Sequence, residues 1–144
     1  MILRALALGL ALLVALPPAG GVTPAAASES APPMTGAEFE AFSTGRTLTF
    51  GYGGTVYGIE KYLPGRRVIW RFLGEECRHG SWFEEGPLIC FVYDDEPGQL
   101  HCWTFHDTPR GLRARFARDG EDGEPVEVRP AETPLVCPGE FLGA

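Results

Sequence analysis

Hydrophobic and polar residues alternate along most of the chain, and this period of two is typical of β-strands with one buried face. Leu48, Phe50 and Tyr52 share one face of the first such segment, for example, with polar residues or glycine between them. Turns rich in glycine, proline and aspartate separate the segments. We expect about eight short strands, over residues 47–52, 55–63, 67–73, 81–84, 88–93, 100–105, 112–117 and 126–129.

Strands that follow one another at such regular spacing predict an all-β fold, an antiparallel meander. An open meander leaves two unpaired edges, so we expect it either to close into a small barrel or to fold into a β-sandwich of two packed layers. The barrel is the favoured interpretation. The tail after residue 129 contains Pro130, Pro134 and Pro138, which cannot lie centrally in a sheet.

One short helix is expected before the first strand. Thr35 stands three residues before Glu38, which is a capping-box pattern. Phe39 and Phe42 follow on one helical face, and Gly45 is a typical residue to end the helix. We expect the two phenylalanines to cover one end or one edge of the sheet.

The N-terminus has the features of a secretory signal peptide. Arg4 precedes an apolar block over residues 5–16, and an Ala-x-Ala cleavage site follows at 25–27. This block is shorter than the roughly 20 residues that a membrane span needs. We therefore predict a signal peptide over 1–27, a disordered lead-in over 28–34 and one β domain over 35–144, in a protein exported to the periplasm or the extracellular space.

The charge of the chain argues against nucleic acid as a partner. The formal net charge is −7, and it becomes −8 when residues 1–27, with one arginine and no acid, are removed. A surface with this excess of acid repels a phosphate backbone.

Four cysteines in an exported chain predict two disulfides, because that compartment is oxidising. If residues 94–98 form the loop of a β-hairpin, Cys90 lies directly opposite Cys102, within reach of a disulfide. This pairing leaves Cys77 to bond with Cys137.

Several short stretches resemble small exported bacterial β proteins that are grouped only as domains of unknown function. The stretches are Tyr62-Leu63-Pro64-Gly65-Arg66-Arg67-Val68, Gly80-Ser81-Trp82, Leu88-Ile89-Cys90 and Cys102-Trp103. The resemblance covers about forty residues and implies a lipocalin-like or similar small β-barrel of the cell envelope. It implies no active-site residues. Cys77 and Cys137 are additional to the two cysteines of typical members.

Aromatic residues on neighbouring strands are the compositional feature with most functional potential. They either belong to a buried strand pair that is covered on both sides, or line a pocket for a small ligand. For the second interpretation the candidate ligand-binding residues are Trp70, Tyr93, Trp103, Arg67 and Arg71. We accordingly expect a non-catalytic module that binds a small ligand.

The alternative is a protein-interaction module, such as an inhibitor of an envelope protease or lysozyme. Its candidate contact is the acidic hairpin tip of Asp94, Asp95 and Glu96. We find no catalytic or cofactor motif and no metal-ligand spacing in the sequence, and we expect the three histidines at the surface. The protein is thus predicted not to be an enzyme and to need no cofactor or metal.

Overall fold

The computed structural model describes residues 31–120 and 123–139. The predicted signal peptide and the first part of the predicted lead-in lie outside the described residues. The elements, in chain order, are α1 (Gly36–Ser43), β1 (Thr47–Tyr52), β2 (Thr55–Leu63), the 3₁₀ turn η1 (Pro64–Arg66), β3 (Arg67–Phe72), β4 (Arg78–Glu85), β5 (Leu88–Tyr93), β6 (His101–Thr108), β7 (Gly111–Phe116) and β8 (Val126–Pro130). Among these described elements, no helix has the length and apolar character needed to cross a membrane.

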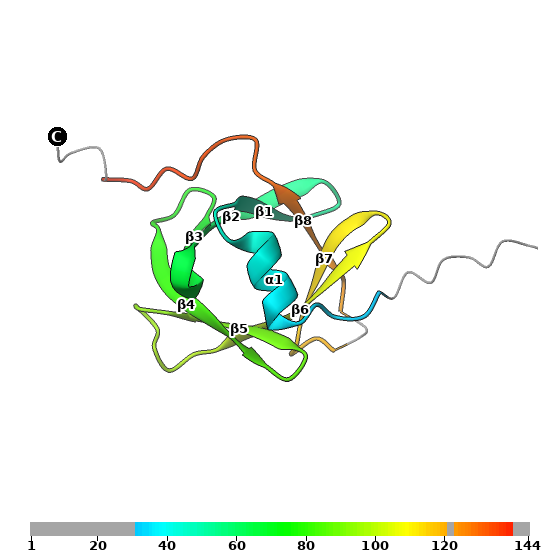
Figure 1. Ribbon diagram of the computed structural model, residues 1–144. Helices are drawn as coiled ribbons and strands as arrows, with labels where there is room; N and C mark the ends of the chain where they lie inside the picture. The colour runs from blue at the N-terminus through cyan, green and yellow to red at the C-terminus, as the bar shows by residue number, and fades with distance from the viewer. Residues whose placement is uncertain (1–30, 121–122, 140–144) are drawn as a thin grey trace, which may run out of the picture.

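The eight strands form a closed antiparallel barrel, which confirms the predicted fold and decides between barrel and sandwich (Figure 1). Each strand pairs with the next along the chain, and β8 pairs with β1 to close the ring. In that closing pair Phe50 lies opposite Val128, so both apolar faces point into the barrel. Closure leaves neither end of the meander as an open edge.

The hairpin of β5 and β6 has the register that its loop length predicts. Cys90 lies opposite Cys102, their Cα atoms are 4.0 Å apart, and the two residues form a disulfide. The second disulfide joins Cys77 to Cys137 across a Cα separation of 5.5 Å. Both predicted pairings are therefore confirmed.

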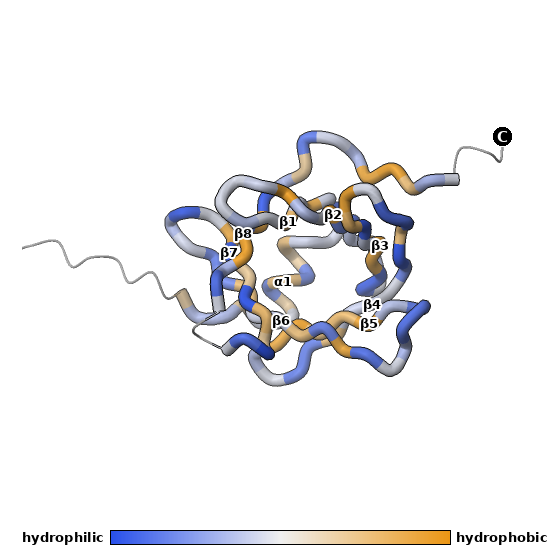
Figure 2. The backbone as a smooth tube through the Cα atoms, turned by 180° about the vertical axis from the view of Figure 1, so that it is seen from behind, coloured by the Kyte–Doolittle hydropathy of each residue, from blue (hydrophilic) through white to orange (hydrophobic). Residues whose placement is uncertain are grey.

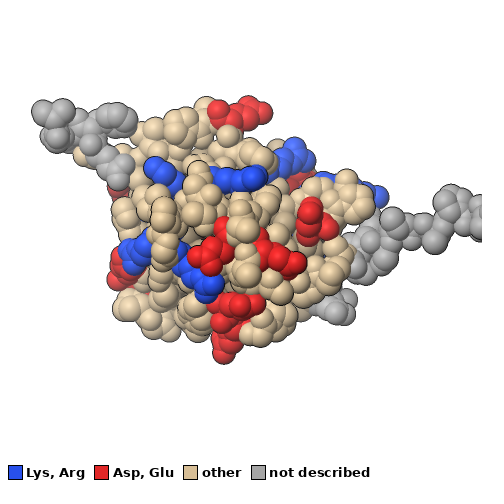
Figure 3. Space-filling view, in the orientation of Figure 1, with Lys and Arg blue, Asp and Glu red and all other residues tan. Residues whose placement is uncertain are grey.

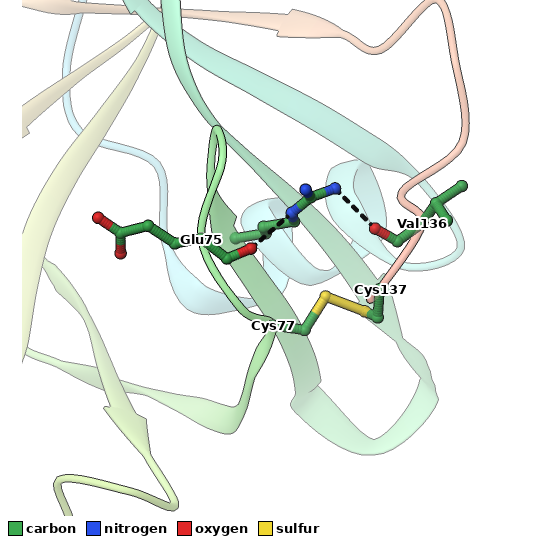
Figure 4. The surroundings of a disulfide bond; sticks show 5 residues. Glu75, Cys77, Val136 and Cys137 are labelled. Atoms are coloured by element: carbon green, nitrogen blue, oxygen red, sulfur yellow. Dashed lines mark hydrogen bonds between the residues drawn. A yellow bond between two sulfur atoms is a disulfide. The ribbon is translucent and has the colours of Figure 1, made fainter. Parts of the chain in front are cut away.

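The second disulfide holds the C-terminal tail against the outside of the barrel. Figure 4 shows this contact, in which Cys77 follows β3 and Cys137 comes from the tail. Arg71 of β3 strengthens it, because its guanidinium donates to the backbone carbonyls of Glu75 and Val136, each at 2.8 Å. The proline-rich tail is thus fixed without joining the sheet.

Helix α1 fills one end of the barrel. The Thr35 hydroxyl accepts a hydrogen bond from the Glu38 backbone, and the Glu38 carboxylate accepts one from the Thr35 backbone, so the predicted capping box is present. Phe39 points into the core and is fully buried. Figure 3 shows the outside of this end, where acidic and basic side chains lie close together. Arg66 and Glu40 form an ion pair at 2.8 Å.

Part of the predicted disordered lead-in is hydrogen-bonded to β6. The Met34 N–H donates to the Phe105 carbonyl at 2.7 Å, and His106 Nδ1 donates to the Ala31 carbonyl at the same distance. Strand β5 pairs with β6 only as far as Trp103, so beyond that residue the edge of β6 that faces β5 has no partner strand. The Phe105 carbonyl and the His106 side chain thus hold Met34 and Ala31 against β6, and the disorder expected for the lead-in as a whole stays a prediction.

Candidate functional site

The end of the barrel opposite α1 contains a cavity of about 370 Å³. On β2, Tyr62 contacts Phe39 of the helix, whereas Glu60 and Tyr57, nearer the other end of the strand, line the cavity. Figure 2 views the barrel from this second end. The cavity walls are mainly aromatic and include Phe50, Trp70, Phe91, Tyr93, Trp103 and Phe105.

Two inward-facing glycines allow the aromatic side chains to lie close to the barrel wall. A Cβ atom at Gly58 would come within 2.1 Å of the Trp70 indole. A Cβ atom at Gly80 would come within 2.4 Å of the Val92 carbonyl and 2.9 Å of the Tyr93 ring. Only glycine permits these approaches without a shift of the neighbouring groups. The space that the aromatic side chains surround forms the cavity.

The polar centre of the cavity is Glu60, whose inward position follows from the alternation of β2. Its side chain is 2% exposed, and two phenols donate to its carboxylate: Tyr62 at 2.6 Å and Tyr93 at 3.1 Å. Burial raises the pKa of Glu60 to about 7, although these two hydrogen bonds act in the opposite direction. Near neutral pH the cavity can therefore hold either a carboxylate or a neutral acid.

The raised pKa of Glu60 predicts a pH-dependent free energy of unfolding. The unfolded chain loses this proton near the ordinary value of 4.5, whereas the folded chain keeps it until about pH 7. Between these values the folded state binds more protons, so stability falls as pH rises and levels off above pH 7, by about 3 kcal/mol in total. The Glu60→Gln variant lacks this contribution.

Urea unfolding of both proteins from pH 4.5 to 8 measures the difference. We expect the wild type to lose stability relative to Glu60→Gln across this interval. Parallel pH profiles for the two proteins would show that Glu60 keeps its ordinary pKa in the fold.

Arg78 and His101 lie where the cavity meets the β5–β6 loop. The Arg78 guanidinium lies 4.7 Å from the centre of the Tyr93 ring and pairs with Asp95 at 2.8 Å and with Glu96 at 2.6 Å. His101 Nε2 is buried and has no hydrogen-bond partner among the described residues. Burial, followed by the charge of Arg78, lowers the pKa of His101.

The structure brings together only some of the residues that the sequence predicted for a ligand site. Trp70, Tyr93 and Trp103 all line the cavity. Arg67 and Arg71 do not, because they alternate with the inward residues of β3 and lie on its outer face. Arg67 instead pairs with the tip residue Asp94 at 3.1 Å, and Arg71 binds the tail.

The acidic tip also differs from the freely exposed contact that the sequence indicated. All three of its carboxylates pair with arginines of β3 or β4: Asp94 with Arg67, and Asp95 and Glu96 with Arg78. These side chains stay about half exposed. Through Arg78, the tip residues Asp95 and Glu96 are therefore linked to the cavity lining.

Sequence reasoning missed Glu60, Arg78 and His101 as members of the site. A signal for Glu60 was present, since the alternation that places Tyr62 inside the barrel places Glu60 there too. His101 is corrected from a surface residue to a lining residue by the same argument, because it shares a face with Trp103. Arg78 comes directly after the Cys77 loop and gave no comparable signal.

A cluster of possible metal ligands on the outside of β4, β5 and β6 has no free thiolate. Glu85, Cys90 and Cys102 place their ligand atoms within 4.8 Å of one another. Both sulfurs belong to one disulfide. A disulfide sulfur is a poor metal ligand compared with a thiolate.

No family model, curated protein or solved structure matches the chain. The resemblance to small exported β proteins of unknown function therefore stays a prediction.

Proposed function

We propose that the protein is an exported, non-catalytic binding protein that holds a small, mostly apolar ligand inside the barrel at the end opposite α1. The observation that carries the proposal is the contrast between the two ends of the barrel interior. Phe39 fills one end, whereas a cavity of about 370 Å³ lies at the other. This volume is within the range of small-molecule sites, which are typically lined by aromatic groups with a few polar ones.

Export to the periplasm or the extracellular space is supported by the two disulfides. One joins Cys77 to Cys137, which are distant along the chain, and the other joins Cys90 to Cys102 on neighbouring strands. Together they use all four cysteines. Disulfides of this kind persist in oxidising compartments and are rare in the cytosol.

The interaction-module alternative would rely on Asp94, Asp95 and Glu96. Their pairing with Arg67 and Arg78 gives these acids partners within the same chain. A protein partner would have to compete for them, so the cavity is the better supported site.

Two phenylalanines with nearly equal exposure provide a matched test of the cavity. Phe72 of β3 lines the cavity mouth and is 38% exposed, whereas Phe83 of β4 lies outside the barrel and is 37% exposed. We expect Phe72→Ala to weaken binding of the neutral fluorescent probe N-phenyl-1-naphthylamine about tenfold, since it removes an aromatic contact with the ligand. Probe fluorescence during a titration measures the affinity.

Phe83→Ala is the control, and we expect it to bind the probe like the wild type. Equal losses of affinity in the two variants would place the probe outside the cavity. No probe binding to the wild type would refute the proposed function.

A further inference from the structure

We propose that the natural ligand of the cavity is an organic cation, such as a hydrophobic amine or a quaternary ammonium compound. This inference rests on the proposed function and specifies the chemical class of the ligand. Three features of the cavity carry it: the arrangement of its aromatic rings, the carboxyl group inside it, and the balance of charges at its mouth.

The rings around Trp70 stand at steep angles to the indole instead of stacking on it. The interplanar angles are 75° to Phe50, 61° to Tyr57 and 89° to Phe72, with ring centres 5.1–6.2 Å apart. The rings that meet Trp70 thus form the walls of a box, and Tyr57 also stacks on Tyr52 with an interplanar angle of 21°. Aromatic boxes attract cations through the electron-rich ring faces, and they are the usual solution for binding quaternary ammonium groups.

Glu60 supplies the negative charge that such a ligand needs. The phenols of Tyr62 and Tyr93 each donate to one oxygen of the carboxylate and hold it in place, yet each oxygen keeps a further lone pair. Once Glu60 is ionised, a neutral apolar ligand would seal the carboxylate away from water without a counter-charge, which is unfavourable. A cation in the cavity would neutralise the carboxylate.

Arg78 is the feature that would favour an anionic ligand, but its charge is already compensated. Three hydrogen bonds connect its Nε and Nη2 atoms to the carboxylates of Asp95 and Glu96, and its guanidinium lies over the Tyr93 ring. An anion would have to compete with two carboxylates for this one arginine.

The remaining charges that the structure describes near the mouth do not reverse this balance. Asp119 lines the cavity. The pKa of Tyr52 at the rim is raised first by burial, and then by the negative charges of Asp119 and Glu124. Arg118 lies over the Phe116 ring at 5.5 Å. Acidic groups thus outnumber basic ones among these described residues, which favours a cation.

The test compares two probes of the same shape that differ only in charge. Benzyltrimethylammonium carries a permanent positive charge, and neopentylbenzene replaces its nitrogen by carbon. Displacement of N-phenyl-1-naphthylamine by each probe, in the wild type and in Glu60→Gln, gives four affinities. We expect the wild type at pH 8 to bind the ammonium probe at least tenfold more tightly than neopentylbenzene, and Glu60→Gln to lose most of this preference.

A pH series separates Glu60 from the other titratable groups around it. Those groups are Tyr52 on β1, Tyr57 and Tyr62 on β2, Tyr93 on β5, Arg78 on β4, His101 on β6 and Asp119 after β7. We expect wild-type affinity for the ammonium probe to rise between pH 6 and pH 8, as Glu60 loses its proton. The pKa of His101 is lowered by burial and by the charge of Arg78. Glu60→Gln keeps His101 and the other groups, so any rise that persists in the variant belongs to a group other than Glu60.

Equal affinities of the wild type for the two probes, or tighter binding of benzenesulfonate than of either, would overturn the inference and leave the proposed function standing. Failure of every probe, including N-phenyl-1-naphthylamine, would refute both. The wild-type comparison of the two probes decides the question even if Glu60→Gln does not fold.

Discussion

Replacing Phe39 by alanine is expected to lower the free energy of unfolding by about 3–5 kcal/mol. The Phe39 side chain is fully buried. Its ring centre lies 4.4 Å from that of Phe105, 5.1 Å from Trp82 and 5.5 Å from Tyr62. Alanine would remove these contacts and leave a void that a closed ring of strands cannot collapse to fill. Urea unfolding followed by tryptophan fluorescence measures the loss.

Phe42 of the same helix is the matched control for this substitution. It is only partly buried, and its ring also contacts the Arg46 guanidinium at 4.8 Å. We expect Phe42→Ala to cost about 1 kcal/mol. Similar losses for the two variants would mean that α1 covers the barrel from outside, without placing a ring in its core.

Removing the disulfide between Cys77 and Cys137 is expected to lower the free energy of unfolding by about 4 kcal/mol. The bond links residues 60 positions apart, so the unfolded chain gains much conformational freedom when it is absent. A double substitution, Cys77→Ser with Cys137→Ser, would also release the tail from the outside of the barrel. Thermal and urea unfolding of the double variant measure the effect.

The other disulfide provides the comparison. Cys90 and Cys102 are 12 positions apart on strands that already pair, and we expect their double serine variant to lose about 3 kcal/mol. The hairpin should keep its register, because the inward residues of β5 and β6 fix it. A larger loss for this pair than for Cys77 and Cys137 would contradict the explanation by loop entropy.

The strands, the helix and the disulfides could be predicted from the sequence because they depend on local pattern. Alternation sets which residues point inward, and the length of the 94–98 loop sets which residues of β5 and β6 face each other. Closure of the meander then followed from the need to pair the edges of β1 and β8. Apart from this closure and the pairing of Cys77 with Cys137, which followed by elimination, these arguments use neighbours along the chain.

The site depended on three-dimensional placement and was predicted only in part. Alternation along each strand indicates that Trp70, Tyr93 and Trp103 point inward. They come together in the cavity because their strands curve around one axis. Arg67 and Arg71 are also candidates from the sequence, although they alternate with the inward residues of β3 and lie on its outer face. Alternation along the strand therefore argues against including them.

The cavity itself could not be predicted from the pattern. Its position depends on α1 entering one end of the barrel and on Gly58 and Gly80 admitting large rings against the wall. These contacts join residues that are far apart in the chain. The role of Glu60 is likewise defined by Tyr93 of β5, whose phenol reaches across the interior.

The central claim is that a ligand enters the barrel at the end opposite α1, and the three tryptophans report on it directly. Trp70 and Trp103 line the cavity, whereas Trp82 contacts Phe39 at the helix end. In ¹H–¹⁵N spectra each indole N–H gives one signal, which can be assigned from single Trp→Phe variants. On saturation with N-phenyl-1-naphthylamine we predict large shifts for the Trp70 and Trp103 signals and little change for Trp82. Shifts confined to Trp82, or no shift in any of the three, would contradict the account.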